Sequence, residues 1–183
     1  MANITGSSAA AQKHDQAETL AEEISHQNAP TNAVVEHLQR QAANAFILYT
    51  NYKHYHWQSY GPLFRDLHLL FDEFADAVLA TADDFAERVR MIGQDPVSRP
   101  QEILTTASVK VAEHYGQSMR QMIEEADANL LVVIKEMRDG ARTADEQNDP
   151  GTVDLFSRHV QIHEKHEWWL RDILEKKRDG LAA

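Results

Sequence analysis

The sequence predicts an all-α protein built as a four-helix bundle, and three observations lead to this fold class. The chain of 183 residues holds only seven Gly and five Pro, while Ala, Leu, Glu, Gln and Arg are abundant, which favours helices. Apolar residues recur at steps of three and four along four long segments, as on the buried face of a helix. No strand-like alternation, internal repeat or glycine-rich phosphate loop interrupts these segments. The length fits one domain.

The first two long helices are expected on either side of Tyr60-Gly61-Pro62. The first begins at Asn32, and the Gly-Pro pair supplies its C-terminal cap and its stop. Its apolar stripe consists of Leu38, Ala42, Ala45, Tyr49, Tyr52 and His56. The second begins near Leu63 and ends at Gly93, and its stripe consists of Leu67, Leu70, Phe71, Phe74, Val78, Ala82, Phe85 and Val89. The short link between the two predicts an antiparallel hairpin.

The other two long helices follow a crossover connection over residues 95–117, which holds a short helical turn at 101–106. The third helix is expected over 118–147, where Gly140 costs about 1 kcal/mol relative to Ala and predicts a weak spot. The fourth helix has Asp149 as its N-cap and Pro150 at its first position, and it runs to about Lys177. The short link between the third and fourth helices also predicts an antiparallel hairpin. The four helices together define a bundle domain over 32–178.

Two segments lie outside the expected bundle. Residues 1–31 are small and polar and predict a flexible N-terminal arm with one short helical piece at 17–26, and residues 179–183 form a short C-terminal tail. No run approaches the roughly 18 apolar residues of a membrane span, and the N-terminus has no signal-peptide pattern. A cytoplasmic protein without a membrane partner is therefore expected.

The charged residues point to cations rather than nucleic acid. The chain has 29 Asp and Glu against 18 Lys and Arg, a formal charge of −11, together with ten His and no Cys. The lack of cysteine excludes disulfides, thiolate metal sites and a cysteine nucleophile. The negative charge disfavours a generic electrostatic grip on nucleic acid, because that grip depends on neutralising phosphates.

The second expected helix carries a pattern of metal ligands. His68 and Asp72 are four residues apart and project from one face, and Asp83 and Glu87 repeat this spacing. The two pairs lie on one stripe but about 16 Å apart along the axis, whereas metal–ligand bonds are about 2 Å long. One chain cannot close both pairs on one ion. Two copies of this helix crossing antiparallel about a two-fold axis would join them into two equivalent sites.

His56, near the end of the first helix, is placed by the tight link to join His68 as a second nitrogen ligand. A nitrogen and carboxylate set without thiolate suits Fe(II), Mn or Zn. The alternative interpretation is that these are solvated surface pairs, with Glu87 paired to Arg90. Two such pairs in register beside an apolar stripe strengthen the metal interpretation, because unpaired carboxylates there are costly, but the spacing alone leaves both interpretations open.

The motifs in this region resemble those of the Dps proteins, the mini-ferritins named for DNA protection in starved cells. The resemblance is carried by Lys53-His54-Tyr55-His56-Trp57, Tyr60-Gly61-Pro62-Leu63-Phe64-Arg65-Asp66-Leu67-His68, Phe71-Asp72-Glu73 and Asp83-Asp84-Phe85-Ala86-Glu87-Arg88. The order of the expected helices resembles that of the family over about residues 33–177. The motifs quoted above are similar to those of cyanobacterial members.

The resemblance implies a ferritin-like bundle that assembles into a hollow dodecamer. Such a shell is a ferroxidase, which oxidises Fe(II), preferably with hydrogen peroxide rather than oxygen, and stores ferric mineral inside as protection against oxidative stress. The residues that match the family's catalytic metal ligands are His56, His68 and Asp72 from one subunit and Asp83 and Glu87 from its two-fold partner. Trp57 matches a tryptophan kept near the site, as an electron donor or as a packing anchor.

Two further features are less decisive. His159, His163 and His166 share one arc of the fourth helix, where they predict either an auxiliary metal site, for instance for zinc, or buried polar packing. By resemblance, Asp149 and Asp154 line the three-fold pores through which Fe(II) enters, although Asp149 is also explained as an N-cap and Arg158 departs from the acidic pattern.

Two other functions compete with the ferroxidase. One is a shell that sequesters zinc or another metal with slow iron oxidation. The other is a nucleoid-associated protein that coats DNA, as family members with lysine-rich tails do. Because the N-terminal arm has one lysine against four acidic residues, we expect weak or no DNA binding.

Overall fold

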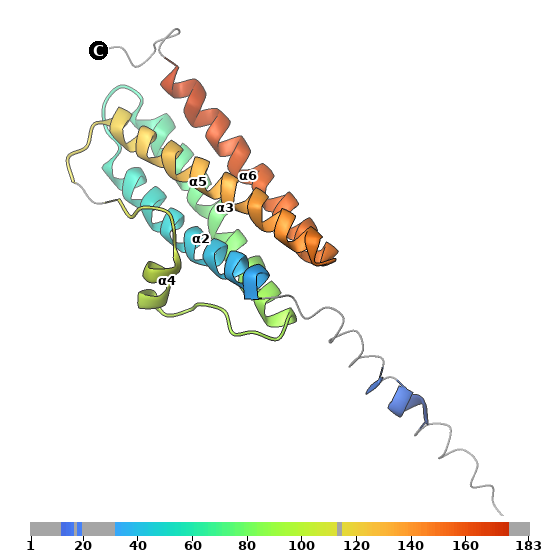
Figure 1. Ribbon diagram of the computed structural model, residues 1–183. Coiled ribbons are helices and arrows are strands. Elements are labelled where there is room, and N and C mark those ends of the chain that lie inside the picture. Colours follow the sequence, from blue (N-terminus) through green and yellow to red (C-terminus); the bar gives the residue numbers. More distant parts are fainter. Residues whose placement is uncertain (1–11, 17, 20–31, 113–114, 176–183) are drawn as a thin grey trace, which may run out of the picture.

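The structure is a computed structural model that describes residues 12–16, 18–19, 32–112 and 115–175. Its main elements are α2 (Asn32–Gln58), α3 (Phe64–Met91), the short α4 (Pro100–Thr106), α5 (Met119–Glu146) and α6 (Pro150–Leu174). Figure 1 shows four long helices aligned side by side, with α4 on the crossover that connects α3 to α5. Within the described residues there is no strand, and the expected all-α four-helix bundle is confirmed.

The bundle is made of two antiparallel hairpins. α2 packs along α3 and α5 along α6, and the hairpins meet through α2 against α5 and α3 against α6 (Figure 1). Gly61 and Gly93 adopt left-handed φ angles of +83° and +84° where the sequence predicts the ends of the first two helices. At the start of α5, Ser118 and Gln121 form a reciprocal capping box. These turn and cap residues explain why the boundaries follow the sequence pattern closely.

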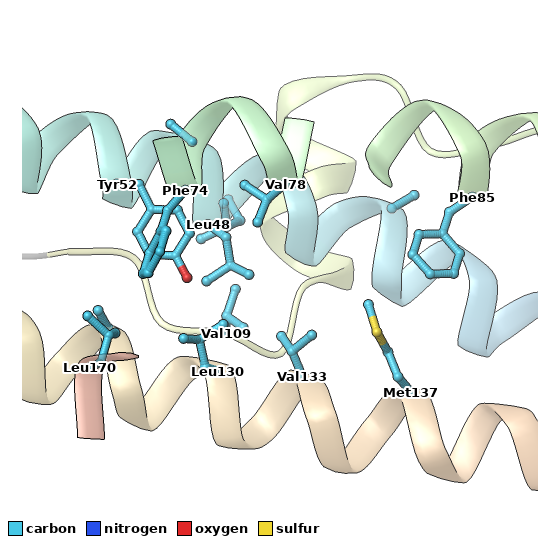
Figure 2. Close-up of a cluster of buried hydrophobic side chains, with 14 of the residues drawn as sticks. Leu48, Tyr52, Phe74, Val78, Phe85, Val109, Leu130, Val133, Met137 and Leu170 are labelled. Atoms are coloured by element: carbon cyan, nitrogen blue, oxygen red, sulfur yellow. The ribbon is translucent and has the colours of Figure 1, made fainter. Parts of the chain in front are cut away.

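The core is apolar and rich in aromatic rings. Figure 2 shows Tyr52 and Phe74 from the first hairpin facing Leu130, Val133 and Met137 of α5. All five of these side chains are fully buried or nearly so. Each such side chain contributes about 1.5–3 kcal/mol on burial, so this layer holds the two hairpins together.

Gly140 of α5 lies against the ring of Phe156 of α6. A Cβ atom built on Gly140 would lie 2.6 Å from the ring of Phe156, which is fully buried. Glycine here makes room for an aromatic ring, and the weak spot expected from helix propensity stays a prediction. This contact could not be found from helix propensity, because it depends on the register between two helices.

Three buried asparagines hold the crossover against the bundle. Asn44 and Asn51 of α2 and Asn129 of α5 exchange hydrogen bonds of 2.7–3.2 Å with the backbone of residues 108–112. The side-chain amides satisfy backbone groups that have no helical or strand partner there. These hydrogen bonds thus hold the crossover against α2 and α5.

Two expectations concern the ends of the chain. Residues 12–16 and 18–19 are helical, while most of the expected flexible arm, 1–31, and of the helical piece at 17–26 lies outside the described residues. α6 ends at Leu174, earlier than the predicted Lys177, which is not described. Among the described helices, none is long and apolar enough to cross a membrane.

Candidate metal centre

His56 and His68 come together at the turn between α2 and α3. His56 lies in the last turn of α2 and His68 in the first turns of α3, and the short link folds one ring onto the other. The two imidazole rings are stacked, with centroids 3.6 Å apart and an angle of 20° between the planes. The structure therefore brings together the two histidines that the sequence predicted as nitrogen ligands.

The hydrogen bonds of these rings leave one nitrogen of each ring available. His56 Nδ1 lies 2.6 Å from the carbonyl oxygen of His68, and His68 Nδ1 lies 2.9 Å from the carbonyl oxygen of His56. Because a carbonyl oxygen only accepts, each Nδ1 is assigned as the donor, and the lone pair of a neutral ring is then on Nε2. This is the arrangement of metal-binding histidines, in which the second nitrogen is oriented by a backbone carbonyl.

Asp72 lies one turn beyond His68 on α3 and is held by a lysine. Lys53 of α2 forms an ion pair with Asp72 Oδ1, and His56 Nδ1 is 3.9 Å from the same oxygen. The hydrogen bond from Lys53 holds the pKa of Asp72 below its usual range. The carboxylate is therefore ionised at neutral pH and beside the two imidazoles.

Lys53 is the residue of this site that the sequence did not assign. It precedes His56 by three residues, which puts the two on neighbouring positions of one helix face. That spacing is a signal, but the partner of Lys53 lies 19 residues away on another helix. Only the register of the hairpin shows which carboxylate it meets.

Asp83 and Glu87 lie farther along α3 and both are exposed. Within the described residues neither has a hydrogen bond or an ion pair. The alternative pairing of Glu87 with Arg90 is wrong, because Arg90 contacts the carbonyl oxygen of Gln94 and the carboxylate of Asp95. Two exposed carboxylates one helical turn apart remain free to bind a cation from outside the chain.

The described part of one chain does not assemble a complete metal centre. The rise of α3 separates Asp72 from Asp83 by about 16 Å. No group of three or more His, Asp or Glu side chains is arranged to hold a metal ion in the described residues of a single chain. The structure thus places His56, His68 and Asp72 together and leaves Asp83 and Glu87 apart, so the five residues stay a prediction that needs a second copy.

Trp57 follows His56 and points to solvent. Its side chain is 70% exposed, so it contributes nothing to the core of its own chain. An anchoring role inside this bundle is excluded. A role beside the metal centre or against a second copy stays a prediction.

The three histidines of α6 are buried in the bundle, not displayed on its surface. His159 Nε2 lies 2.9 Å from Asp84 Oδ2, His166 stacks on Phe74 with centroids 3.8 Å apart, and His163 is 1% exposed. Both ring nitrogens of His163 lack a hydrogen-bond partner among the described residues. This arrangement favours the buried-packing interpretation and gives the auxiliary metal site no support.

Burial decides the protonation of these histidines. It lowers the pKa of His163 to about 3 and that of His166 to about 4, and it also lowers the pKa of His159, where Asp84 opposes it. His163 and His166 are therefore neutral at pH 7.

The two aspartates at the start of α6 have different surroundings. Asp149 is buried, where it accepts hydrogen bonds from Thr152 N at 3.0 Å and Thr152 Oγ1 at 2.6 Å and pairs with Arg88 at 2.5 Å. The N-cap interpretation is confirmed, and these contacts occupy both carboxylate oxygens. Asp154 is exposed and lies 3.1 Å from Arg158. Of the two carboxylates only that of Asp154 is exposed, and a pore role stays a prediction for both.

Comparisons with known proteins agree on the family. The model of the ferritin-like domain matches residues 35–179. DNA protection during starvation protein 1 of Deinococcus radiodurans is 34% identical over 145 residues, which cover 79% of this chain and 70% of that protein. General stress protein 20U of Bacillus subtilis is 32% identical over 77% of this chain and 97% of its own.

Solved structures give the same result. The X-ray structure of Dps from Thermosynechococcus elongatus is 47% identical, with a TM-score of 0.78 over 82% of this chain and 94% of that chain. The archaeal Dps homologue from Halobacterium salinarum is 29% identical, with a TM-score of 0.77 over 82% of both chains. The chain belongs to the ferritin-like family, as a mini-ferritin of the Dps type.

Proposed function

We propose that this mini-ferritin is a ferroxidase and iron-storage protein that oxidises Fe(II), preferably with hydrogen peroxide, and keeps the ferric product inside a shell. The observation that carries the proposal is the stacked pair His56 and His68, whose Nε2 atoms are free beside the ionised Asp72. The Dps structure from Vibrio cholerae, 25% identical with a TM-score of 0.75, is described as a member of the ferritin-like diiron-carboxylate proteins. The donor set suits iron, and the description of that relative favours iron over Mn or Zn.

The site works between two subunits in this proposal. Asp83 and Glu87 of the partner subunit complete the centre when two copies of α3 cross antiparallel about a two-fold axis. That arrangement makes two equivalent centres per dimer, and each chain supplies half of each. By resemblance, six such dimers build a hollow twelve-subunit shell.

The chemistry follows from the ligand types. Anionic carboxylate oxygens attract Fe(II) and stabilise Fe(III) over Fe(II), while imidazole nitrogens bind iron without adding negative charge, which limits how tightly the Fe(III) product is held. Two Fe(II) ions together give two electrons to hydrogen peroxide, which takes up two protons and forms two water molecules. Paired electron transfer avoids the release of hydroxyl radical, which supports the protective role.

Lys53 regulates access to Asp72 in this scheme. Its ammonium occupies the carboxylate oxygen that an arriving cation needs, so Fe(II) binding displaces Lys53. Until then the ion pair keeps Asp72 ionised and positioned beside the histidines.

The charge of the chain argues against the DNA-coating alternative. A formal charge of −11 repels the phosphate backbone at moderate salt, while it attracts Fe(II). We therefore propose weak or no DNA binding. A gel shift near pH 7 in about 50 mM salt that retards all the DNA at low protein excess would contradict this.

The test of the proposed function is stopped-flow Fe(II) oxidation with peroxide and, separately, with oxygen. The variant with both His68→Ala and Asp83→Ala is expected to lose at least about tenfold in rate with peroxide, because ligands matter at least as much as the groups that orient them. Glu73→Ala, which removes an exposed carboxylate next to Asp72 in sequence, is the matched control. An unchanged rate in the double variant would refute the site assignment.

A further inference from the structure

The second half of α3 is held against the start of α6 by Arg88. Its guanidinium donates hydrogen bonds from Nη2 to Asp149 Oδ1 at 2.5 Å and from Nε to Thr152 Oγ1 at 2.9 Å. Both acceptor residues are buried. Because the donors of a guanidinium have a fixed planar geometry, two such bonds determine the position of the group as well as neutralising the buried carboxylate.

Gly151, the second residue of α6, provides space for this guanidinium. A Cβ atom built on Gly151 would lie 3.1–3.2 Å from three atoms of the Arg88 guanidinium, so the planar group lies directly against the glycine. Thr152 Oγ1 also donates a hydrogen bond of 2.6 Å to Asp149 Oδ2, which orients the carboxylate that accepts from Arg88. The start of α6 therefore forms a fitted site for an arginine of α3.

One helical turn before Arg88, Asp84 makes a second polar contact between the same two helices. Asp84 Oδ2 lies 2.9 Å from His159 Nε2. Phe85 adds an apolar contact, because its ring packs against Phe156 and His159 of α6 with centroids 5.5 and 5.1 Å apart. These polar and aromatic contacts together determine which face of α3 is turned toward α6.

Asp83 and Glu87 directly precede Asp84 and Arg88 in the chain. Neighbouring residues of an α-helix lie about 100° apart around its axis, so these two pairs occupy adjacent stripes of α3. Asp83 and Glu87 are exposed, whereas Asp84 and Arg88 are partly buried against α6. The contacts that hold Arg88 on α6 therefore also fix the direction in which the two exposed carboxylates point.

We propose that Arg88 is a positioning residue for the half of the metal centre that each chain supplies to its partner. The inference rests on the proposed function, in which Asp83 and Glu87 complete the centre of a second copy. Arg88 acts on these two carboxylates through the rotation of α3 and not as a ligand. A shift of about 1 Å in a reacting group can cost about 10²-fold in rate, so losing the Arg88 contacts should slow Fe(II) oxidation although every ligand is kept.

The first test measures the effect of these contacts on α3 without iron. Hydrogen exchange of the full-length protein, followed by mass spectrometry, compares Arg88→Gln with Arg90→Gln, the same substitution at an exposed arginine of the same helix. We expect amide exchange over residues 83–91 to rise at least about fivefold in Arg88→Gln alone, with little change over 64–72.

Arg88→Lys provides a second variant in case Arg88→Gln does not fold. Lysine keeps a positive charge beside Asp149 but lacks the planar donors that contact Asp149 and Thr152 together. Its exchange over residues 83–91 should rise by a smaller factor than in Arg88→Gln. Exchange over this range at the rate of the unmodified protein in both Arg88 variants would overturn the proposal.

The second test identifies which half of the centre depends on Arg88. Subunits with two different affinity tags combine Arg88→Gln with either His68→Ala or Asp83→Ala, and Fe(II) oxidation by peroxide is measured in stopped flow. In a mixed dimer with His68→Ala, one centre keeps all its ligands and receives its carboxylates from a chain with Arg88 in place. In a mixed dimer with Asp83→Ala, both centres receive a defective half.

Random pairing with His68→Ala should therefore leave about a quarter of the centres intact, and pairing with Asp83→Ala should leave none. Recovery that is confined to the Asp83→Ala mixture would overturn the proposal, because Arg88 would then serve the histidine half. Equal rates in the two mixtures would overturn it as well, since the substitution would then spare both halves or damage the whole subunit. Full rates in His68→Ala and Asp83→Ala subunits on their own would instead refute the proposed function, on which the inference depends.

Discussion

The ammonium group of Lys53 forms an ion pair with Asp72, the carboxylate that lies beside the stacked rings of His56 and His68. A cation that uses Asp72 as a ligand competes with this ion pair. The same contact explains why the pKa of Asp72 lies below its ordinary value. Lys53 is consequently a residue through which cation affinity can be changed without touching a ligand.

Replacing Lys53 by Met should tighten Fe(II) binding at the centre. The variant removes both the competitor for Asp72 and one positive charge beside an arriving cation, and the known size of exposed ion pairs predicts a gain of about two- to fivefold. Anaerobic titration calorimetry with Fe(II) measures the affinity. Lys53→Arg keeps the charge and should leave the affinity near that of the unmodified protein. Weaker binding in Lys53→Met would show that Lys53 positions Asp72 and does not compete for it.

Subunits with complementary defects should restore activity if each centre is shared by two chains. A dimer of one His68→Ala chain and one Asp83→Ala chain has one centre with both defects and one with all its ligands. Random pairing of the two variants makes about half of the dimers mixed, so about a quarter of the centres are intact. Co-expression with two affinity tags, followed by stopped-flow oxidation of Fe(II), measures the recovered fraction. Activity no higher than that of either variant alone would place all the ligands in one chain.

Gly140→Ala should destabilise the bundle, although Ala is the better helix former. The gain in helix propensity is about 1 kcal/mol, but the new Cβ would meet the Phe156 ring at 2.6 Å, and overpacking of a core costs about 1–3 kcal/mol. We expect a net loss of up to about 2 kcal/mol, seen as a lower thermal unfolding midpoint. In a Phe156→Leu background the ring is gone, and the same substitution should raise the midpoint. A stabilised Gly140→Ala single variant would mean that the ring moves aside at no cost.

The fold was predictable because its signals are local. Helix ends follow glycine and proline at Gly61-Pro62, Gly93 and Pro150, and the threefold and fourfold spacing of apolar residues identifies each buried face. The spacing of His68 and Asp72 on one helix is local in the same sense. The sequence accordingly predicted the helices and the positions of both pairs, one helical turn apart, on α3, while their role as ligands stays a prediction.

What the sequence could not predict depends on the register between helices. Lys53 meets Asp72, and Phe156 meets Gly140, only because two helices pack with a particular offset. The surroundings of the His163 ring also depend on how the helices pack. The apolar arc of α6 placed this histidine near the core, but only the packing shows that neither of its ring nitrogens has a partner in the described part of the chain. Such contacts can be identified only from the tertiary structure.

Those buried histidines predict a loss of stability in mild acid. His163 and His166 have pKa values of about 3 and about 4 in the folded chain, against 6.5 for the unperturbed side chain. A lowered folded pKa means that the unfolded chain binds the proton more readily, so stability falls as the pH drops below about 6.5 and continues to fall toward the folded values. At pH 5 each histidine costs on the order of 2 kcal/mol relative to pH 8.

His163→Leu should therefore flatten the acid limb of the stability profile. Leucine keeps an apolar side chain of similar size at a site that is 1% exposed, and it cannot take up a proton in the unfolded chain. Unfolding midpoints measured from pH 8 to pH 5 should fall less in this variant than in the unmodified protein, by an amount equivalent to about 2 kcal/mol. His14→Leu, at an exposed histidine, is the matched control and should leave the slope unchanged. If His163→Leu and the unmodified protein lost stability in parallel, the acid sensitivity would come from other groups, because a buried neutral imidazole must contribute to the slope wherever unfolding exposes it to protons.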